Sequence, residues 1–116
     1  RGNTSKKIIE MVRSKGAKNV YFASAAPPVR FQNVYGIDMP ATRELVAHGK
    51  TIQEVKEIIG ADELVYQDIE DLRMAAHIGN PSITQFEDSV FTGEYCAGKI
   101  SKEYLHSLEK SRSSKP

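Results

Sequence analysis

Residues 1–24 read Arg-Gly-Asn-Thr-Ser-Lys-Lys-Ile-Ile-Glu-Met-Val-Arg-Ser-Lys-Gly-Ala-Lys-Asn-Val-Tyr-Phe-Ala-Ser, and this stretch indicates the fold class. Its middle part predicts an amphipathic helix over residues 6–15, which Gly16 would end. The residues expected on the buried face of that helix are Ile8, Met11 and Val12. Residues 19–24 are short, apolar and β-prone, which is typical of a strand buried on both faces of a parallel sheet. A helix followed by such a strand is half of a βαβ unit and predicts an α/β protein.

The first five residues, Arg1, Gly2, Asn3, Thr4 and Ser5, form a turn suited to hold a phosphate. Gly2 lets the backbone approach an anion closely, and the free N–H groups of the following helix would point at it. Thr4 and Ser5 add hydroxyl donors. A turn of this kind more often serves as a helix cap, and both interpretations remain open on these residues. Because residue 1 is Arg and no strand precedes the turn, we expect the chain to be the remainder of a longer protein, cut inside its ligand site.

The composition excludes several classes of protein. A chain of 116 residues is one domain at most, and 40% hydrophobic with 27% charged residues is ordinary for a soluble globular protein. If compact, it would bury roughly two-thirds of its unfolded surface. A net charge of +1 argues against a nucleic-acid or membrane surface, and no apolar run is long enough to span a bilayer. The single cysteine, Cys96, excludes an internal disulfide and favours a cytoplasmic location.

A long loop should follow the first strand, because Pro27 and Pro28 cannot continue a ladder. We expect this loop to extend through Met39 and to be fixed by its apolar side chains. Those side chains are Phe31, Val34, Tyr35 and Ile37. Pro40 then suits the first turn of a helix that includes residues 44–47, which Gly49 would end.

The second half of the α/β pattern begins at Thr51-Ile52-Gln53-Glu54, a capping box that predicts the start of a helix ending at Gly60. Its expected buried face consists of Ile52, Val55, Ile58 and Ile59. Residues 64–66 predict a short strand, and Asp68 predicts the cap of a further helix carrying Ile69, Leu72 and Ala76, broken at 79–81. Residues 82–100 predict little regular structure. Ser101 could cap a last helix carrying Tyr104, Leu105 and Leu108, and residues 111–116 should fray.

Most candidate catalytic residues have an ordinary structural explanation. His48, His77 and His106 lack the spacing of a metal site and are interpreted as surface or helix-end residues. Cys96 has no neighbouring base and is interpreted as a packing residue, not a nucleophile. The acids of residues 68–71 suit the first turn of a helix, where the macrodipole favours negative charge. Asp38 in the long loop fits an Asx-type turn and a ligand contact about equally well.

Several segments together resemble one enzyme family. They are residues 1–5, residues 20–27 (Val-Tyr-Phe-Ala-Ser-Ala-Ala-Pro), residues 33–40 (Asn-Val-Tyr-Gly-Ile-Asp-Met-Pro), residues 44–49 (Glu-Leu-Val-Ala-His-Gly) and residues 58–62 (Ile-Ile-Gly-Ala-Asp). In this order they resemble the C-terminal part of the amidophosphoribosyltransferases, the glutamine phosphoribosylpyrophosphate amidotransferases. The resemblance covers nearly the whole chain.

The resemblance implies a partial type I phosphoribosyltransferase fold and the first committed step of purine synthesis. In this family, ammonia from glutamine displaces pyrophosphate from phosphoribosyl pyrophosphate and gives phosphoribosylamine. In the family's signature loop, two adjacent aspartates hold the ribose hydroxyls and a metal, for which magnesium is expected. The last residues of the loop hold the 5′-phosphate. Those last residues correspond to Arg1, Gly2, Asn3, Thr4 and Ser5, with Asn3 where threonine is common. The resemblance also implies purine nucleotide ligands and a homo-oligomer.

The departures from the family predict an inactive fragment. The aspartate pair and the glutaminase nucleophile are absent, so no catalytic residue is assigned. Some members bind an iron–sulphur cluster through cysteines that correspond to residues 87–91, but this stretch reads Glu-Asp-Ser-Val-Phe and no cluster is expected. We assign residues 1–80 to the second half of a phosphoribosyltransferase domain and residues 81–116 to an extension packed on it. Two alternatives remain: an autonomous nucleotide or sugar-phosphate binding module without catalysis, and an assembly segment without a ligand.

Overall fold

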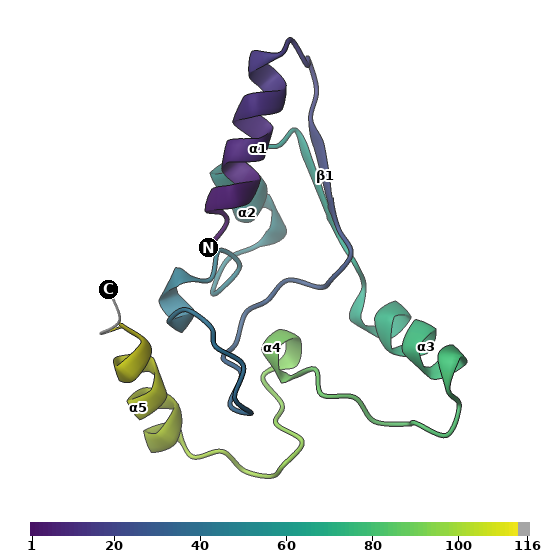
Figure 1. Ribbon diagram of the computed structural model, residues 1–116, viewed down its shortest axis with the longest axis vertical. Helices are drawn as coiled ribbons and strands as arrows, with labels where there is room; N and C mark the ends of the chain where they lie inside the picture. The colour runs from purple at the N-terminus through teal and green to yellow at the C-terminus, as the bar shows by residue number, and fades with distance from the viewer. Residues whose placement is uncertain (114–116) are drawn as a thin grey trace.

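The computed structural model describes residues 1–113 and shows an α/β chain (Figure 1). Its elements in order are α1 (Asn3–Ser14), β1 (Tyr21–Ser24), the 3₁₀ turn η1 (Thr42–Glu44), α2 (Ile52–Ile59), β2 (Glu63–Tyr66), α3 (Ile69–Gly79), α4 (Ser89–Thr92) and α5 (Lys102–Ser113). The predicted α/β class is confirmed. None of the helices within residues 1–113 is both long and apolar enough to cross a membrane.

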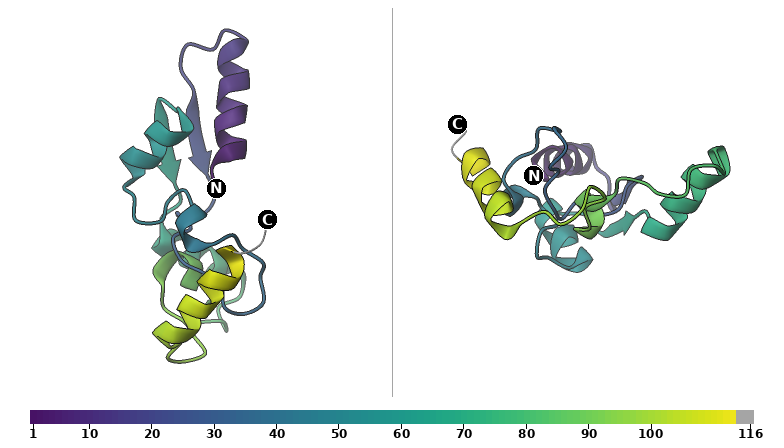
Figure 2. Two further views of the ribbon diagram at one scale, coloured as in Figure 1. Left: turned by 90° about the vertical axis from the view of Figure 1, so that its left-hand side faces the viewer. Right: turned by 90° about the horizontal axis from the view of Figure 1, so that it is seen from below.

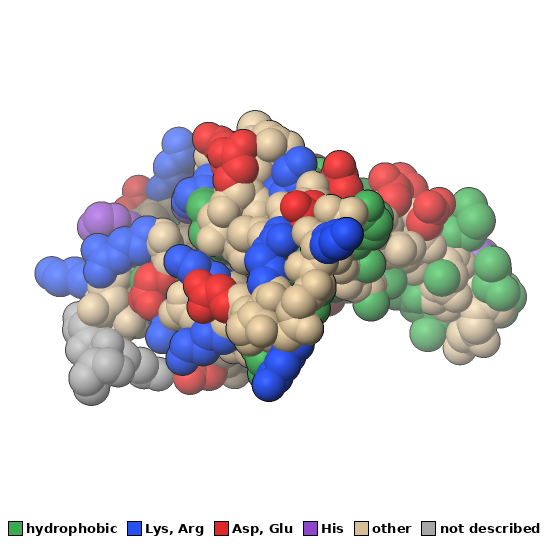
Figure 3. Space-filling model, turned by 90° about the horizontal axis from the view of Figure 1, so that it is seen from above, with side chains coloured by type: hydrophobic (Ala, Val, Ile, Leu, Met, Phe, Trp, Pro, Cys, Tyr) green, Lys and Arg blue, Asp and Glu red, His purple; other side chains and the backbone are tan. Residues whose placement is uncertain are grey.

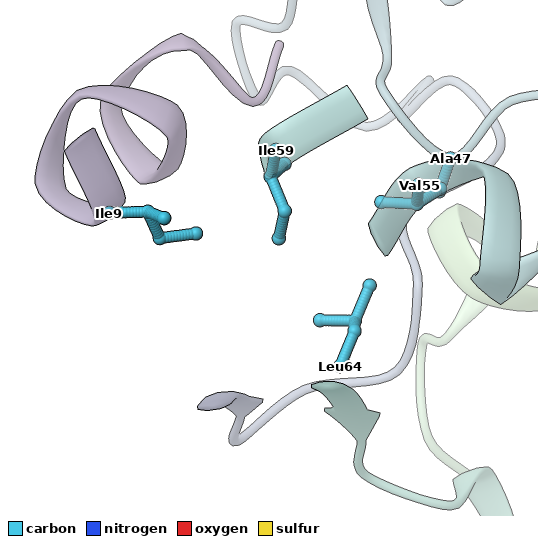
Figure 4. Close-up of a cluster of buried hydrophobic side chains, with 5 residues drawn as sticks. All are labelled: Ile9, Ala47, Val55, Ile59 and Leu64. Atoms are coloured by element: carbon cyan, nitrogen blue, oxygen red, sulfur yellow. The ribbon is translucent and has the colours of Figure 1, made fainter. Parts of the chain in front are cut away.

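The core forms where two parallel strands meet two helices. β1 and β2 pair in register from Tyr21 opposite Glu63 to Ser24 opposite Tyr66. The buried cluster contains Ile9 of α1, Val55 and Ile59 of α2, Leu64 of β2, and Ala47 (Figure 4). Because successive side chains of a strand alternate between faces, Tyr21 and Val65 point away from this cluster, and they are 70% and 61% exposed. The prediction of a strand buried on both faces is therefore wrong.

The helices bury narrower faces than the sequence pattern suggested. In α1 the buried residue is Ile9, whereas Ile8 and Met11 are 44% and 58% exposed. In α2, Ile52 and Ile58 are exposed, and the burial falls on Val55 and Ile59. α1 contacts α2, and α2 contacts β2, so the apolar residues of each predicted face that lie outside these contacts are exposed.

One carboxylate connects the elements of this core. Asp62 Oδ2 accepts from the backbone N–H of Val20 and from Arg13 Nη2, both at 2.7 Å, while the Asp62 N–H donates to Val20 O at 2.9 Å. Arg13 also donates to Gly60 O at 3.0 Å. The bond from Val20 and the bond from Arg13 lower the pKa of Asp62. The end of α1, the start of β1 and the turn before β2 thus meet at Asp62.

The long loop and the turn after it differ from prediction. No helix covers residues 40–47, because Leu45 is extended (φ −70°, ψ 122°) and ends the short 3₁₀ turn η1. The loop is fixed by polar and aromatic residues together: Gln32 and Asn33 are buried, and Tyr35 makes an edge contact with the Tyr95 ring and accepts from the Ala97 N–H at 3.0 Å. The expectation that the apolar side chains fix this loop is therefore confirmed for Tyr35 and wrong for Ile37, which is exposed. Asn33 Oδ1 accepts from the N–H groups of Tyr35 and Ile37, so this asparagine organises the turn.

Local capping motifs place the remaining helices as predicted. Thr51 and Glu54 form the reciprocal capping box of α2, and Asp68 caps α3 through the N–H groups of Glu70 and Asp71. Ser101 Oγ accepts from the Tyr104 N–H at the start of α5. The predicted irregular stretch 82–100 contains only the one-turn α4. Of the tail expected to fray, residues 111–113 belong to α5, and residues 114–116 lie outside the described residues.

The described chain is flat and open. Its radius of gyration is 16.5 Å, whereas roughly 13 Å is expected for a compact chain of this length. α3 and α5 extend in opposite directions from the core elements (Figures 1 and 2), and neither contains a fully buried residue. Hydrophobic side chains gather at the outer end of α3 (Figure 3), where Met74 and Ile78 are 60% and 71% exposed. The single modest core expected from the composition is present as one buried cluster, but the chain around it is not compact.

Two neighbouring isoleucines of α2 test the position of the core. Ile59→Val should lower the free energy of unfolding by about 1 kcal/mol, because it leaves a small void in the buried cluster. Ile58→Val is the matched control and should change it by less than about 0.5 kcal/mol, since Ile58 is 42% exposed. Chemical denaturation of both variants measures the difference. Equal effects would contradict the assignment of the buried face.

The junction at Asp62 should be visible in the pH dependence of stability. A carboxyl whose pKa is lowered on folding stabilises the fold above its unfolded pKa of about 3.9, and this contribution disappears as the pH falls through the folded value. Asp62→Asn should thus lower the melting temperature at pH 7, and the gap in melting temperature between this variant and the unmodified chain should narrow below about pH 4. Glu10→Gln, at an exposed position in α1, is the control. A gap that stays constant with pH would contradict the role of this carboxylate.

Candidate functional site

The start of α1 packs closely against the turn that follows η1. Gly2 occupies the N-cap position of α1 with φ 80°, in the left-handed region. A Cβ atom at Gly2 would lie 2.9 Å from Val46 Cγ2, which is inside the normal contact distance. Both the backbone conformation and the close approach therefore require glycine at this position.

An open pocket of about 570 Å³ lies beside this glycine. It is lined by Arg1, Gly2, Asn3, Thr4, Ser5 and Pro40. The structure thus brings the five residues singled out from the sequence to one surface, where Asn3 and Thr4 are exposed and Ser5 is half-buried. Pro40, from the loop before η1, also lines the pocket.

The electrostatics at this end of α1 favour an anion. The first backbone hydrogen bond of the helix is donated by Lys6 to Gly2 O, so the N–H groups of residues 3–5 precede the helical ladder. The first turn of α1 contains no acidic residue that would neutralise these donors. The positive end of the helix dipole therefore faces the pocket without an internal counter-charge.

An ion pair connects Arg1, one of the lining residues, to η1. The Arg1 Nε lies 3.0 Å from Glu44 Oε2, and the Arg1 side chain is 58% exposed. An ion pair this exposed adds little stability.

The other sequence candidates do not assemble into a site. His48 is exposed, and its Nδ1 lies 2.7 Å from the backbone oxygen of Arg30. His77 is exposed in the last turn of α3, and its Nδ1 lies 2.9 Å from the backbone oxygen of Ile83. Within residues 1–113, no three His, Cys, Asp or Glu side chains are grouped to hold a metal. Cys96 is exposed, with Sγ 3.3 Å from Glu87 Oε2, so its interpretation as a packing residue is wrong.

A larger cavity of about 690 Å³ lies between α3 and the segment before α4. Three of the charged residues at its wall pair with one another: Arg73 contacts Asp88 and Glu70 at 2.6 Å each. These contacts raise the pKa of Arg73, mainly through the hydrogen bond to Asp88. The pairing joins α3 to the N-cap of α4, so Glu70, Arg73 and Asp88 have a structural role.

Sequence reasoning missed the residues that complete the first pocket. Pro40, Glu44 and Val46 contribute a lining side chain, the partner of Arg1 and the contact with Gly2. No local motif marks these three positions, because each acts on residues about forty positions away in the chain. The glycine at the start of a helix was the available signal, and it identified one side of the pocket.

Comparison with known proteins assigns these features to a family. The chain matches none of the protein-family models. It is 53% identical over 112 residues to an amidophosphoribosyltransferase of Haemophilus influenzae, which covers 97% of this chain and 22% of the relative. It is 55% identical over 109 residues to the enzyme of Escherichia coli and 46% identical over 114 residues to that of Saccharomyces cerevisiae. These matches cover 94% and 98% of this chain, and 22% of each relative.

Two solved structures share the fold. One is described as the allosteric regulatory enzyme of purine biosynthesis, with a TM-score of 0.73 and 29% identity over 94% of this chain and 24% of that one. The other is the glutamine phosphoribosylpyrophosphate amidotransferase of Bacillus subtilis complexed with ADP and GMP, with a TM-score of 0.70 and 31% identity. That match covers 88% of this chain and 22% of the other.

The chain spans about a fifth of the length of the curated relatives that it matches. Over that span, sequence and fold agree with the same enzymes, and the partial phosphoribosyltransferase fold predicted from the sequence is confirmed. This chain therefore belongs to the amidophosphoribosyltransferase family.

Proposed function

We propose that this chain supplies the 5′-phosphate site of an amidophosphoribosyltransferase. That enzyme would make 5-phosphoribosylamine from phosphoribosyl pyrophosphate and glutamine-derived ammonia in purine biosynthesis. The observation that carries the proposal is the pocket at the start of α1, where residues 1–5 present unneutralised N–H donors beside a glycine that tolerates no side chain. The names of the relatives support the reaction.

The residues of the pocket would act by binding and positioning the sugar. The N–H groups of residues 3–5 and the hydroxyls of Thr4 and Ser5 would hold the terminal phosphate, with Arg1 at the rim. Phosphoribosyl transfer passes through a cationic, oxocarbenium-like ribose, so the barrier depends on correct placement of the ring. Binding energy at the remote phosphate would secure that placement without touching the reacting carbon.

We propose magnesium as the metal of the intact enzyme, with its ligands mostly outside this chain. The residues that the structure describes do not fit a metal site by themselves, since no group of three candidate ligands occurs among positions 1–113. No step of the reaction is therefore assigned to a metal held by this chain. We expect the 116 residues, tested separately, to bind phosphate without turnover.

Purine nucleotides are the second proposed ligands of the intact enzyme, because a nucleotide carries the same phosphate group. The Bacillus subtilis relative solved with ADP and GMP supports this proposal. We also propose a homo-oligomer in the cytoplasm. The exposed Tyr21 and Val65 on the outer sheet face support a covered surface, and the single free cysteine suits a reducing compartment.

Replacement of Thr4 tests the proposed contact with the phosphate. Thr4→Ala should weaken binding of ribose 5-phosphate to the chain by about tenfold, since a hydrogen bond to a charged group contributes on the order of 1.5–3 kcal/mol. Isothermal titration calorimetry measures this change. In the intact enzyme the same replacement should raise the requirement for phosphoribosyl pyrophosphate and lower turnover.

Thr84→Ala is the matched control, because Thr84 is an exposed threonine lining the cavity beside α3 and not this pocket. It should leave the affinity for ribose 5-phosphate unchanged. Saturable binding that is unaffected by Thr4→Ala would place the phosphate elsewhere. Absence of any saturable binding by the unmodified chain would refute the proposed site.

Gly2→Ala should weaken phosphate binding by more than about tenfold, because the new Cβ would lie 2.9 Å from Val46 Cγ2 and force the turn at residue 2, which lines the pocket, to shift. Gly16→Ala is the control, since Gly16 also has a positive φ (96°) but no atom within 4 Å of the position that a Cβ would take. A second change, Val46→Ala, should restore part of the affinity lost in Gly2→Ala by removing the clash. Equal affinities in the two glycine variants would contradict the close approach at Gly2.

A further inference from the structure

α5 contacts the first half of the chain through Glu109 and Arg112, and the Glu109 carboxylate makes the shortest of these contacts. Glu109 Oε2 accepts from the backbone N–H of Thr42 at 2.7 Å and from Gln32 Nε2 at 2.8 Å. Glu109 Oε1 lies 3.5 Å from the N–H of Arg43. These partners are 66–77 positions away in the sequence, so the contacts join the end of the described chain to its first half.

Glu109 provides the cap that η1 lacks. The N-cap residue of η1 is Ala41, which is fully buried and has no side-chain oxygen to accept from the free N–H groups of the turn. The Glu109 carboxylate takes that role from another element. Burial opposes its charged form, but the hydrogen bonds from Thr42 and Arg43 outweigh burial and leave the pKa of Glu109 lowered. The cap is therefore ionised at neutral pH, and its bonds to the turn are charge-assisted.

Arg112, one turn further along α5, holds the preceding part of the loop. Its Nη2 donates to Asn33 O at 3.0 Å and to Ile37 O at 3.2 Å, and its Nη1 lies 3.3 Å from Gln32 Oε1. The two carbonyls belong to the turn that Asn33 closes from within. A planar guanidinium can bridge acceptors at fixed spacing, so Arg112 fixes the path of this turn.

The segment held in this way forms one side of the pocket at α1. Pro40 lies between the turn bound by Arg112 and the turn capped by Glu109, and it lines the pocket. Glu44, in η1 itself, holds Arg1 at 3.0 Å. We propose that Glu109 and Arg112 are positioning residues, which place residues 32–44 so that Pro40 and Glu44 complete the phosphate pocket. This inference rests on the proposed function of that pocket.

A purely structural role of these contacts would give a different result. α5 contains no fully buried residue in the part that the structure describes, and the buried cluster lies in α1, α2, β2 and Ala47. Loss of the Glu109 cap should therefore release the loop and η1 while the core stays folded. The effect should appear in the affinity of the pocket and in the protection of the loop amides, more than in global stability.

The test compares Glu109→Ala with Glu109→Gln and Glu103→Ala in the full 116-residue chain. Glu103→Ala is the matched control: the same residue type on the same helix, at its exposed first turn. The affinity for ribose 5-phosphate and for inorganic phosphate is measured by calorimetry, and hydrogen exchange is followed in a peptide covering residues 38–44. Glu109→Ala should weaken binding by about tenfold and speed exchange in that peptide, as expected for the loss of charge-assisted bonds.

Glu109→Gln should recover part of the affinity, because its amide oxygen still accepts from the Thr42 N–H, and Glu103→Ala should bind within about twofold of the unmodified chain. If Glu109→Ala does not fold, Glu109→Gln and Arg112→Ala test the positioning role instead, by the same calorimetry and hydrogen-exchange measurements. The positioning role would be overturned if the unmodified chain binds phosphate and the folded Glu109 and Arg112 variants bind it with the same affinity. Absence of binding by the unmodified chain would instead refute the pocket, and the inference would fall with it.

Discussion

The fold depends first on the carboxylate of Asp62. It accepts from the start of β1 and from the end of α1, and it stands at the turn that leads into β2. The five buried side chains of the core come from α1, α2, β2 and Ala47, and none of them belongs to β1. The directional bonds at Asp62 set how α1 lies relative to the parallel strands, and they thereby decide where the other end of α1 meets the rest of the chain.

At that other end of α1, residues 1–5 both carry part of the family resemblance and line the pocket. Gly2 allows α1 to begin against Val46, and Arg1 reaches back to η1. η1 in turn receives its cap from Glu109 of α5. The proposed phosphate pocket is thus shared by three segments that are distant in sequence, although the residues that would touch the phosphate come mainly from one. Such an arrangement separates the binding groups from the groups that position them.

The sequence predicted well the features that are decided within three or four residues. The capping box at Thr51 and the Asp68 cap were found because each satisfies N–H groups in its own first turn. The faces of α1 and α2 were predicted too wide, because helical spacing cannot reveal that the sheet has two strands. The helix expected over 40–47 did not form because Leu45 is extended and ends η1 after three residues. On the site, the turn at Gly2 was recognisable, whereas Pro40, Glu44 and Glu109 act across long separations that no local pattern records.

The flat, open outline has a consequence for how the chain comes apart. Segments with few buried apolar contacts open at low free-energy cost, independently of the better-packed parts. Here α3 and α5 contain no buried residue and are held mainly by polar bonds, while α1, α2, β1 and β2 share the apolar cluster or pack against it. Unfolding should therefore be stepwise, with α3 and α5 losing their contacts before the elements around the apolar cluster unfold. A single melting temperature would describe those elements and would overlook two earlier, separate transitions.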